Sequence, residues 1–596
     1  MVLEELKPFI KVVDTPLEVE LEIPHLAYIE AKKREPKILL FTNPRDRGRP
    51  FEMPVVMNLF ANREVVEAIL GRPVEEIAKE IEELLKPTPP ATLWEKVKFL
   101  GKLLPLRWTI PRRYRGSPRC QQQVWKGDEV DLFKLPVLKS WELDGGRFIT
   151  IGQVYTRSLD GKIRNVGLYR LQLHSKNRLG LHWQIHKDGA HLFWEYKKAG
   201  KKMPVAVGIG GDPLYSWCAT APLPPGIFEL ALYGFIRRKP VQLAQCLTNP
   251  IEVPADLDIV IEGWCDPSQM EIEGMFGDHT GYYTLPEPFP VMEVTAITTA
   301  RDPKYYATVV GKPPVEDKWL GYITERLFLP LLRTTIPDLV DYYLPENGVF
   351  HNLLLAKISP RYPGHSLQIA HALWGVGQMS FLKHAIFLPE EAPDLRKGEE
   401  VARFILNRFS PSALLISKGV VDQLDHSSDA PLVGGKVGVD ATGPEVKREV
   451  TPLSDKELLK KMEEIDPQIV GVTQYFTDTA NPVAVVEVVK REPMKKLFKK
   501  LAPLYPHLRI VIFINTPERE NPYMLVWRVT NNIDGLRDIF IDGPVVGIDA
   551  TNKGEIDNFP REWPPDVDPT PAVVQKLKEL GLVELTDEEL RKFQIV

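Results

Sequence analysis

The chain has 596 residues, of which 44% are hydrophobic and 26% charged, the composition of a globular protein with a sizeable core. Its 75 Lys and Arg residues against 80 Asp and Glu residues give a formal net charge of -5, which argues against a nucleic-acid partner. The four cysteines lack the C-x-x-C spacing of zinc or redox sites. The length predicts roughly three or four domains.

The N-terminal sequence MVLEELKPFI has acids where a signal peptide needs a basic run, and no apolar run approaches about 18 residues. We therefore expect a cytoplasmic protein, peripheral at most to the inner face of a membrane. The segment MKKLFKKLAPLY (494–505) is basic with apolar residues between, which makes it a candidate for membrane contact. The alternative for this segment is a solvated surface helix.

The elements along the chain indicate a multidomain α+β or α/β protein. Residues 1–120 are predicted to form an α/β domain, with a strand at KILLF and an amphipathic helix at PVEEIAKEIEELLK that ends at Pro87. Residues 121–315 alternate with period two between tight turns, which predicts a β-barrel or sandwich. Beyond about residue 315, helices alternate with buried strands, which predicts α/β structure.

The middle region begins with a predicted hairpin, in which two β-rich runs flank Asp160-Gly161. A third strand, RLGLHWQIH (178–186), is predicted to follow at once. On such a strand His182, Gln184 and His186 would face one way, which makes this face a candidate metal site.

The C-terminal part contains an internal repeat. The segment GGKVGVDAT (434–442) recurs as GPVVGIDAT (543–551), and the flanking segments match in layout, which predicts a duplicated unit of about 60 residues. We assign residues 316–448 to a C-terminal α/β domain with the first copy, and residues 449–596 to the second copy and a C-terminal extension. The first copy has Lys436 where the second has Val545.

Two positions in the middle region are candidates for a functional site. Arg170 shares its strand face with apolar neighbours, and a buried arginine needs a carboxylate partner; the alternative is a surface arginine on an edge strand. Glu229 begins an apolar segment, where the helix dipole would favour a first-turn glutamate. Together with Asn165 and His186, Glu229 also completes an O/N/O ligand set that suits Mn²⁺ or Mg²⁺ better than zinc.

These segments, in this order, resemble the UbiD family of decarboxylases, which use prenylated FMN. The resemblance covers most of the chain and runs through NVGLYRLQLHSKN, WQIHKDG, IGGDP, TNPIEVPADLDIVIEG, EIEGMFGDHTGYY, GVFHNLLLAKI, RYPGHSLQIAHALWG, GGKVGVDAT and REWPP. It implies that residues 121–315 form a split β-barrel that binds the flavin, between the N-terminal domain and the duplicated C-terminal one.

The resemblance also implies the residues of the site. Asn165, His186 and Glu229 match the ligands of a Mn²⁺ ion that bridges to the cofactor phosphate, with a K⁺ ion nearby. Arg170, Glu273 and Asp278 match the catalytic trio, and Gly274 and Gly277 are predicted to permit the turn between the two acids. The residues matched to the cofactor-lining and phosphate-contacting positions are Leu168, Tyr169, Arg170, Trp183, Gln184, Lys187, Thr220, Ala221, Pro222 and Lys436.

The implied reaction removes CO₂ from an aromatic carboxylate, which leaves a carbanion without a resonance sink. A general acid contributes about 10²–10⁴-fold, or about 3–5 kcal/mol, so the cofactor has to accept the electrons. Asp278 is expected to deliver the proton, with Glu273 as the alternative, while Arg170 holds the glutamate ionised and anchors the substrate carboxylate. Some members of the family have Glu where this chain has Asp278, and the second copy has no counterpart in shorter members.

The segments most resemble the branch assigned to menaquinone biosynthesis, whose substrates are similar to prenylated 1,4-dihydroxy-6-naphthoate. The ubiquinone branch, acting on polyprenyl-4-hydroxybenzoate, is the close runner-up. Two more hypotheses stay open at this point, namely a decarboxylase or carboxylase of another aryl or acrylic acid, and a flavin-binding carrier without catalysis. The expected partners are an aromatic, prenylated lipid acid, a UbiX-type flavin prenyltransferase that supplies the cofactor, and further copies of the chain in a dimer or hexamer.

Overall fold

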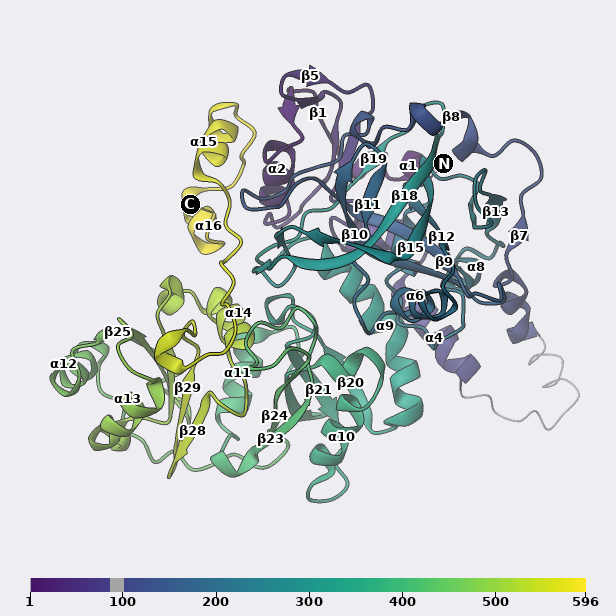
Figure 1. Cartoon of the computed structure of the whole chain (residues 1–596). Coiled ribbons are helices and arrows are strands. Elements are labelled where there is room, and N and C mark those ends of the chain that lie inside the picture. The colour runs from purple at the N-terminus through teal and green to yellow at the C-terminus, as the bar shows by residue number, and fades with distance from the viewer. Residues whose placement is uncertain (1, 86–100, 596) are drawn as a thin grey trace, which may run out of the picture. The chain divides into compact units, whose positions relative to one another are not determined.

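The computed structural model describes residues 2–85 and 101–595, which form two compact units (Figure 1). Unit 1 comprises residues 1–327 and 566–596, and unit 2 comprises residues 328–565. The boundary between them falls inside the long helix α9 (Asp317–Thr335). The chain therefore leaves unit 1 through this helix and returns to it for its last residues.

The N-terminal part of unit 1 is a small mixed sheet with helices. Its strands are, in order, β1 (Ile10–Val13), β3 (Ile38–Phe41), β6 (Val55–Met57) and β19 (Tyr305–Tyr306). The predicted strand at KILLF is β3, and the predicted helix at 73–86 is α4 (Val74–Leu85). The predicted end of that helix at Pro87 lies outside the described residues.

Six antiparallel strands of unit 1 close into a barrel, because the first strand of the sheet also pairs with the sixth. Around the barrel they are β11 (Arg178–Gly180), β10 (Arg164–Ser175), β9 (Phe148–Arg157), β12 (Met203–Ile209), β15 (Ile259–Glu273) and β18 (Glu287–Thr299). A seventh strand, β8 (Gln123–Lys126), extends the sheet beside β18. The predicted hairpin at Asp160-Gly161 joins β9 and β10, with Gly161 at a φ of +74°.

A row of fully buried aliphatic side chains crosses the barrel wall. Val154, Val207, Ile261 and Ile297 are register partners on four successive strands, and each is 0% exposed. Side chains alternate between the two faces of a strand, so a row of this kind fixes which face of each strand is buried. The same register fixes where polar side chains of β10 and β15 point.

The predicted third strand is wrong beyond residue 180. Strand β11 ends at Gly180, and the backbone N–H of Trp183 donates to the carbonyl oxygen of Leu181 at 2.8 Å, a turn that no extended strand contains. The following residues turn into helix α6 (Asp188–Ala199). His182, Gln184 and His186 therefore do not share one strand face.

Unit 2 contains two sheets of five strands with the same topology. In both, the outer pairs are antiparallel and the two inner pairs parallel, so the predicted duplication is confirmed. Each copy is longer than the predicted 60 residues, because a preceding strand pair also belongs to it. The strands are β20 (Leu339–Tyr343), β21 (Leu353–Ile358), β22 (His384–Pro389), β24 (Val433–Asp440) and β23 (Leu414–Val420), then β25 (Ile469–Tyr475), β26 (Val483–Val488), β27 (Ile510–Ile514), β29 (Val545–Asp549) and β28 (Ile539–Asp542).

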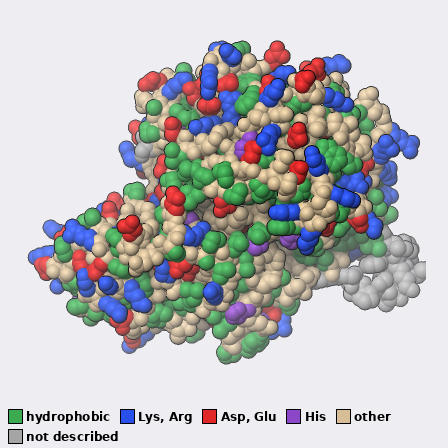
Figure 2. All heavy atoms as spheres, viewed as in Figure 1, with side chains coloured by type: hydrophobic (Ala, Val, Ile, Leu, Met, Phe, Trp, Pro, Cys, Tyr) green, Lys and Arg blue, Asp and Glu red, His purple; other side chains and the backbone are tan. Residues whose placement is uncertain are grey.

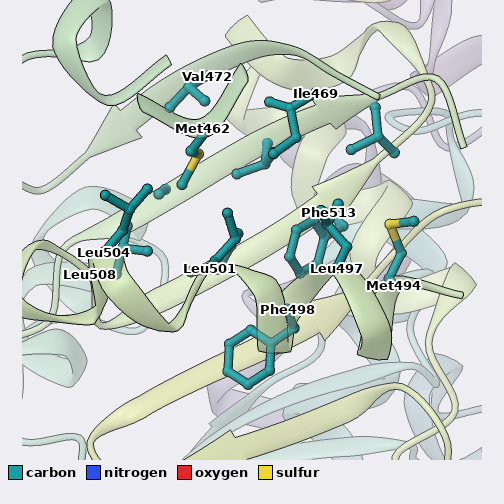
Figure 3. Packing of buried hydrophobic residues seen from close by; sticks show 14 of the residues in the cluster. Met462, Ile469, Val472, Met494, Leu497, Phe498, Leu501, Leu504, Leu508 and Phe513 are labelled. Atoms are coloured by element: carbon teal, nitrogen blue, oxygen red, sulfur yellow. The ribbon is translucent and has the colours of Figure 1, made fainter. Parts of the chain in front are cut away.

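Helix α13 (Met494–Lys500) packs into the core of the second copy (Figure 3). Met494, Leu497 and Phe498 are all buried there, and Gly547 of β29 leaves room for the Phe498 ring, since a Cβ at that glycine would lie 2.7 Å from Cδ2 of the ring. The apolar residues of this segment face the protein interior. The membrane-contact interpretation of 494–505 is therefore wrong for α13, and only its lysines face outward.

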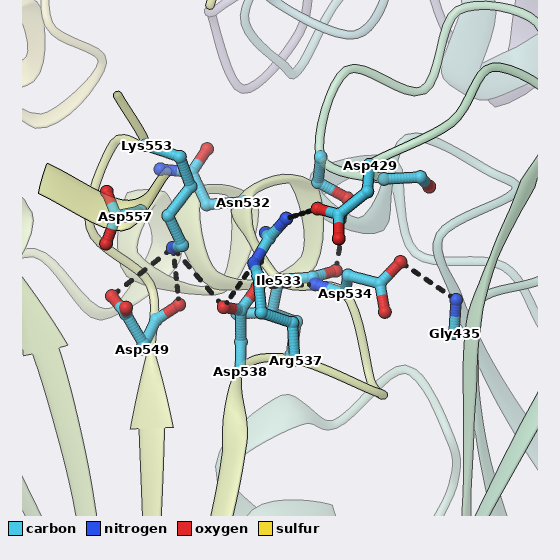
Figure 4. Close-up of polar contacts among 12 residues, drawn as sticks. Asp429, Gly435, Asn532, Ile533, Asp534, Arg537, Asp538, Asp549, Lys553 and Asp557 are labelled. Carbon is cyan, nitrogen blue, oxygen red and sulfur yellow. Dashed lines mark hydrogen bonds and ion pairs between the residues drawn. The ribbon is translucent and has the colours of Figure 1, made fainter. Parts of the chain in front are cut away.

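Polar contacts join the two copies (Figure 4). Asp534 of the second copy accepts a hydrogen bond from the backbone N–H of Gly435 at 2.9 Å, and Arg537 pairs with Asp429 at 2.5 Å and with Asp538 at 2.7 Å. A Cβ at Gly435 would lie 2.4 Å from Asp534 Oδ1. The close approach of the two copies therefore requires glycine at this position.

The face of the molecule in Figure 2 carries acidic and basic side chains interspersed, in keeping with the nearly balanced composition. All four cysteines are buried with free thiols. Within residues 2–85 and 101–595, none of the helices combines the length and the apolar character that crossing a bilayer requires.

Removing Arg528 tests the buried ion pair of the second copy. Arg528 and Glu518 are 1% and 0% exposed, with Nη2 and Oε1 2.9 Å apart. Arg528→Met removes the positive charge that faces the buried carboxylate of Glu518, so we expect the free energy of unfolding to fall by about 3–5 kcal/mol in urea denaturation. Arg403→Met, which breaks the exposed pair with Asp478, should leave the free energy of unfolding almost unchanged. Equal losses in the two variants would contradict the role of the buried pair.

Candidate active site

Arg170 lies at an irregular point of β10, where the register with β9 shifts between Tyr169 and Leu171. Such shifts re-aim a side chain relative to the regular pleat. The guanidinium donates from Nε and Nη2 to Oε1 of Glu273, at 3.0 and 2.6 Å, and from Nη1 to Oδ2 of Asp278. The prediction that Arg170 pairs with a carboxylate is confirmed, and both acids that were expected to flank it do so.

Two more side chains complete the environment of the guanidinium. Nη2 also donates to the hydroxyl of Thr284 at 2.9 Å, and the guanidinium carbon lies 4.6 Å from the centre of the Phe276 ring. The Arg170 side chain is 9% exposed, against 2% for Glu273 and 8% for Asp278. One positive charge thus faces two negative charges in a nearly dry site, which gives the trio a net negative charge.

Glu273 is the last residue of β15, and Asp278 opens the loop between two short strands, β16 (Phe276–Gly277) and β17 (Tyr283–Thr284). The loop closes on itself, because Asp278 N–H donates to the carbonyl of Tyr282 at 3.1 Å and Gly281 N–H donates to that of Asp278 at 3.0 Å. Gly281 has a φ of +81°, which favours glycine.

The predicted role of Gly274 and Gly277 is wrong, since neither has a positive φ. They are needed for close packing instead. A Cβ on Gly274 would lie 2.7 Å from the Cα of Gly145, and one on Gly277 would lie 2.3 Å from Cδ1 of Trp141. Asp144 also holds Gly277, because its Oδ1 accepts a hydrogen bond from the N–H of Gly277 at 2.8 Å.

The charges of the trio set its protonation. Burial would raise the pKa of Glu273, but the charge of Arg170 and the hydrogen bond from His182 outweigh burial and hold the pKa below its usual value. Burial also opposes ionisation of Asp278, yet Arg170 and His279 hold its pKa far below the usual range. Both acids are therefore ionised at neutral pH as long as Arg170 contacts them.

Two histidines contact the acids of the trio, and neither contact is predicted from the sequence. Nδ1 of His182 lies 2.9 Å from Oε1 of Glu273, and Nδ1 of His279 lies 2.8 Å from Oδ1 of Asp278. Burial, aided by Arg170, lowers the pKa of His182, so the neutral ring donates its Nδ1 proton to Glu273. The adjacency of His279 to Asp278 in the sequence was a usable signal, whereas the turn that delivers His182 was not.

Asn165 and Glu229 lie together at the other end of β10. Nδ2 of Asn165 donates to Oε1 of Glu229 at 2.8 Å, and the backbone N–H of Val166 donates to Oε2 at 2.8 Å. Glu229 directly precedes helix α8 (Leu230–Arg237), and burial raises its pKa to about 7. A buried carboxylate of this kind gains from a cation, and an amide oxygen beside it suits a hard divalent ion.

The other predicted ligand, His186, is exposed on the turn before α6. The structure thus brings two of the three predicted ligands into contact, and His186 stays a prediction. Thr220, Ala221 and Pro222 follow helix α7 (Pro213–Cys218), and the residue before them, Ala219, accepts a hydrogen bond from the N–H of Leu168 on β10 at 2.9 Å. Lys436 belongs to unit 2, where its Nζ donates to the carbonyl oxygens of Ser380 and Leu382 at 2.5 and 2.7 Å.

Three family models match the chain. They are the N-terminal domain of 3-octaprenyl-4-hydroxybenzoate carboxy-lyase over residues 9–85, its Rift-related domain over residues 112–313 and its C-terminal domain over residues 318–441. The chain belongs to the UbiD family. The barrel and the trio described above lie within the Rift-related domain.

Sequence relatives and solved structures agree with this assignment. A Helicobacter pylori protein is 51% identical over 98% of this chain and 96% of its own length, and an Aquifex aeolicus protein is 44% identical over 68% of this chain and 83% of its own. The UbiD-class enzyme HmfF of Pelotomaculum thermopropionicum, solved with FMN, superposes with a TM-score of 0.63 at 27% identity, over 76% of this chain and 98% of HmfF.

Vanillic acid decarboxylase of Sedimentibacter hydroxybenzoicus shares the fold, with a TM-score of 0.64 at 21% identity over 78% of this chain and 98% of that enzyme. UbiD-family decarboxylases are therefore the structural neighbours of this chain, which is a carboxy-lyase by family and fold.

Replacing Arg170 tests the electrostatics of the trio. Arg170→Met leaves Glu273 and Asp278 buried without the charge that lowers their pKa, so the pKa of both should rise above the unfolded value. Native carboxyls with a raised pKa bind more protons than the unfolded chain, so stability should fall as pH rises between about 5 and 8. In the unaltered protein the pKa of both acids is lowered instead, so these two groups do not make stability fall as pH rises through this range. Urea denaturation across this range measures both slopes; equal slopes would contradict the account.

Proposed function

We propose that this protein removes CO₂ from an aromatic carboxylic acid with prenylated FMN as its cofactor. The observation that carries the proposal is the Arg170 guanidinium, on a strand of a UbiD-family barrel, between Glu273 and Asp278. A second HmfF structure, of an evolved dimeric form, contains prenylated FMN, which supports this choice of cofactor. A flavin prenyltransferase of the UbiX type would supply it.

The described residues fit such a cofactor. Three buried polar atoms near β10 and β11 have no hydrogen-bond partner in the described protein: Nε2 of His182, Nε1 of Trp183 and Oε2 of Glu273. Leaving such atoms unpaired is costly, so they favour a polar ligand. Asn165, Glu229 and His186 would hold Mn²⁺ against the phosphate, with K⁺ nearby, and the lining would include Leu168, Tyr169, Gln184, Lys187, Thr220, Ala221, Pro222 and Lys436.

When bound, the prenylated flavin supplies the electron sink that departing CO₂ requires. The residues of the chain then have three tasks. Arg170 binds the carboxylate of the incoming acid, Glu273, itself held by His182, keeps the guanidinium in place, and Asp278 provides the proton that replaces CO₂ on the ring carbon. The overall change, a carboxylate and a proton giving an arene C–H and CO₂, balances in atoms and charge.

The low pKa of Asp278 sets the order of events. While Arg170 contacts Asp278, the acid is ionised and cannot donate. A substrate carboxylate that competes for the guanidinium weakens this contact, so the pKa of the buried Asp278 rises and it takes up a proton. His279, 27% exposed and 2.8 Å from Asp278, is placed to carry that proton from solvent. Glu273 is the alternative donor.

The substrate class we favour is a prenylated aromatic acid of quinone biosynthesis, of the menaquinone or ubiquinone type. The matching family models are named for 3-octaprenyl-4-hydroxybenzoate carboxy-lyase, which supports an acid with a lipid tail. Neighbours named for vanillic acid and 3,4-dihydroxybenzoic acid act on small phenolic acids, which are the alternative. A homo-oligomer, dimer or hexamer, is expected as in the family.

Substituting the proton donor tests the reaction. In protein co-produced with a flavin prenyltransferase, Asp278→Asn should retain the cofactor absorbance but release CO₂ from aromatic acids about 10²–10⁴-fold more slowly, because the amide has no proton to give. Glu287→Gln, an exposed acid opposite Glu273 in the β15–β18 ladder, is the control and should turn over normally. A protein that holds cofactor and releases CO₂ from no acid would be a flavin carrier instead.

A lipid substrate requires contact with a bilayer surface, and residues 101–115 have the chemistry for it. Leu104, Leu106 and Ile110 are 55%, 43% and 68% exposed. Five basic residues and no acid occupy the segment, in a chain of negative net charge: Lys102, Arg107, Arg112, Arg113 and Arg115. The segment is held on α8, since a Cβ on Gly234 would lie 1.9 Å from the carbonyl oxygen of Trp108. Helix α8 begins beside Glu229.

Vesicle binding tests this surface. The protein should sediment with phosphatidylglycerol vesicles and not with phosphatidylcholine ones, and about 0.5 M salt should weaken binding by screening. Leu104→Ser with Ile110→Ser should weaken binding about tenfold, because both side chains would enter the interface. Val470→Ser with Val489→Ser, two exposed valines of unit 2, is the control; equal weakening would place the surface elsewhere.

A further inference from the structure

The last residues of the chain cross the loop that carries Asp278. After the second copy the chain returns to unit 1, and Asp566 forms an isolated antiparallel bridge with Tyr282. The N–H of Val567 donates to the carbonyl of Gly281 at 2.8 Å, and Val567 is fully buried. Gly281 and Tyr282 make the backbone hydrogen bonds of the loop to Asp278. We call residues 566–570 the strap.

A buried lysine fastens the strap. Nζ of Lys312 pairs with Oδ2 of Asp566 at 3.1 Å and Oδ1 of Asp568 at 2.6 Å, and the lysine side chain is 3% exposed. The backbone carbonyl of Lys312 accepts from Tyr28 Oη at 3.0 Å and from Lys32 Nζ at 2.6 Å, which fixes its position within unit 1. Because Lys312 is nearly buried, removing its acidic partners would leave a poorly solvated positive charge, which is costly.

The strap also reaches the opposite side of the catalytic loop. The N–H of Thr570 donates to Nε2 of His25 at 2.8 Å, and the His25 ring lies 5.2 Å from that of Trp141. Trp141 is the residue against which Gly277 packs at the start of the loop. Contacts of the strap therefore bracket the loop, at Gly281 and Tyr282 directly and at Gly277 through two rings.

The loop needs this support. Strands β16 and β17 have two residues each, and a two-stranded ribbon of that length is not stable on its own. We propose that the strap is a positioning element for catalysis, with Asp566, Val567 and Lys312 as the positioning residues that keep Asp278 in reach of Arg170. The proposal rests on the proposed function, but its structural part does not depend on turnover.

The test compares two variants of the strap ion pairs. Asp566→Asn with Asp568→Asn neutralises the two strap carboxylates that pair with Lys312, whereas Lys576→Met removes the pair between Lys576, which lies beyond the strap, and Glu22. Hydrogen–deuterium exchange of the Asp278 and Gly281 amides should quicken about tenfold or more in the first variant and stay unchanged in the second. Asp566→Glu with Asp568→Glu should restore slow exchange.

Kinetics give the second measurement. With a substrate acid in hand, the strap variant should lose kcat about tenfold with KM and cofactor absorbance unchanged, because the proton donor and not the binding site is displaced. Unchanged exchange at Asp278 and Gly281 in the strap variant, or equal effects in Lys576→Met, would overturn the proposal. If the unaltered protein turned over no acid, the proposed function would fail, and the exchange rates alone would still decide the role of the strap.

Discussion

One guanidinium on a barrel strand has to stabilise two buried carboxylates, one at the end of β15 and one in the loop between β16 and β17. Each acid would take up a proton in such surroundings, because burial disfavours its charge, and the nearby charge of Arg170, with hydrogen bonds from His182 and His279, reverses this. The arrangement also keeps Arg170 from being an unpaired buried cation. The register shift in β10, the end of β15 and the tight loop after β16 all serve to bring these three side chains to one place.

The residues packed around the loop of Asp278 also tolerate little change. The loop carrying Asp278 fits only because Gly274 and Gly277 allow Gly145 and Trp141 to approach. Asp144 and Val567 hold it from two further sides. Segments from the middle and the end of the chain therefore meet at the loop that carries Asp278, and both segments belong to unit 1.

Patterns of short range were predictable from the sequence. Period-two alternation and the Asp160-Gly161 turn predicted the hairpin. The apolar neighbours of Arg170 predicted that it has a carboxylate partner. The strand through residue 186 failed, because a turn after Gly180 redirects the chain into α6. The sequence suggests that Gly274 and Gly277 allow the backbone to turn. Their role is instead the close approach to Gly145 and Trp141, which only the tertiary structure reveals. The strap contacts join residues hundreds apart, which no local pattern encodes.

The most direct test of the account is a crystal structure of the protein loaded with prenylated FMN and manganese. We expect the phosphate and the metal at Asn165, His186 and Glu229, with the Asn165–Glu229 hydrogen bond replaced by metal ligation, and the flavin rings beside Arg170. The account would be contradicted by a flavin bound away from Arg170, Glu273 and Asp278, or by a metal with other ligands.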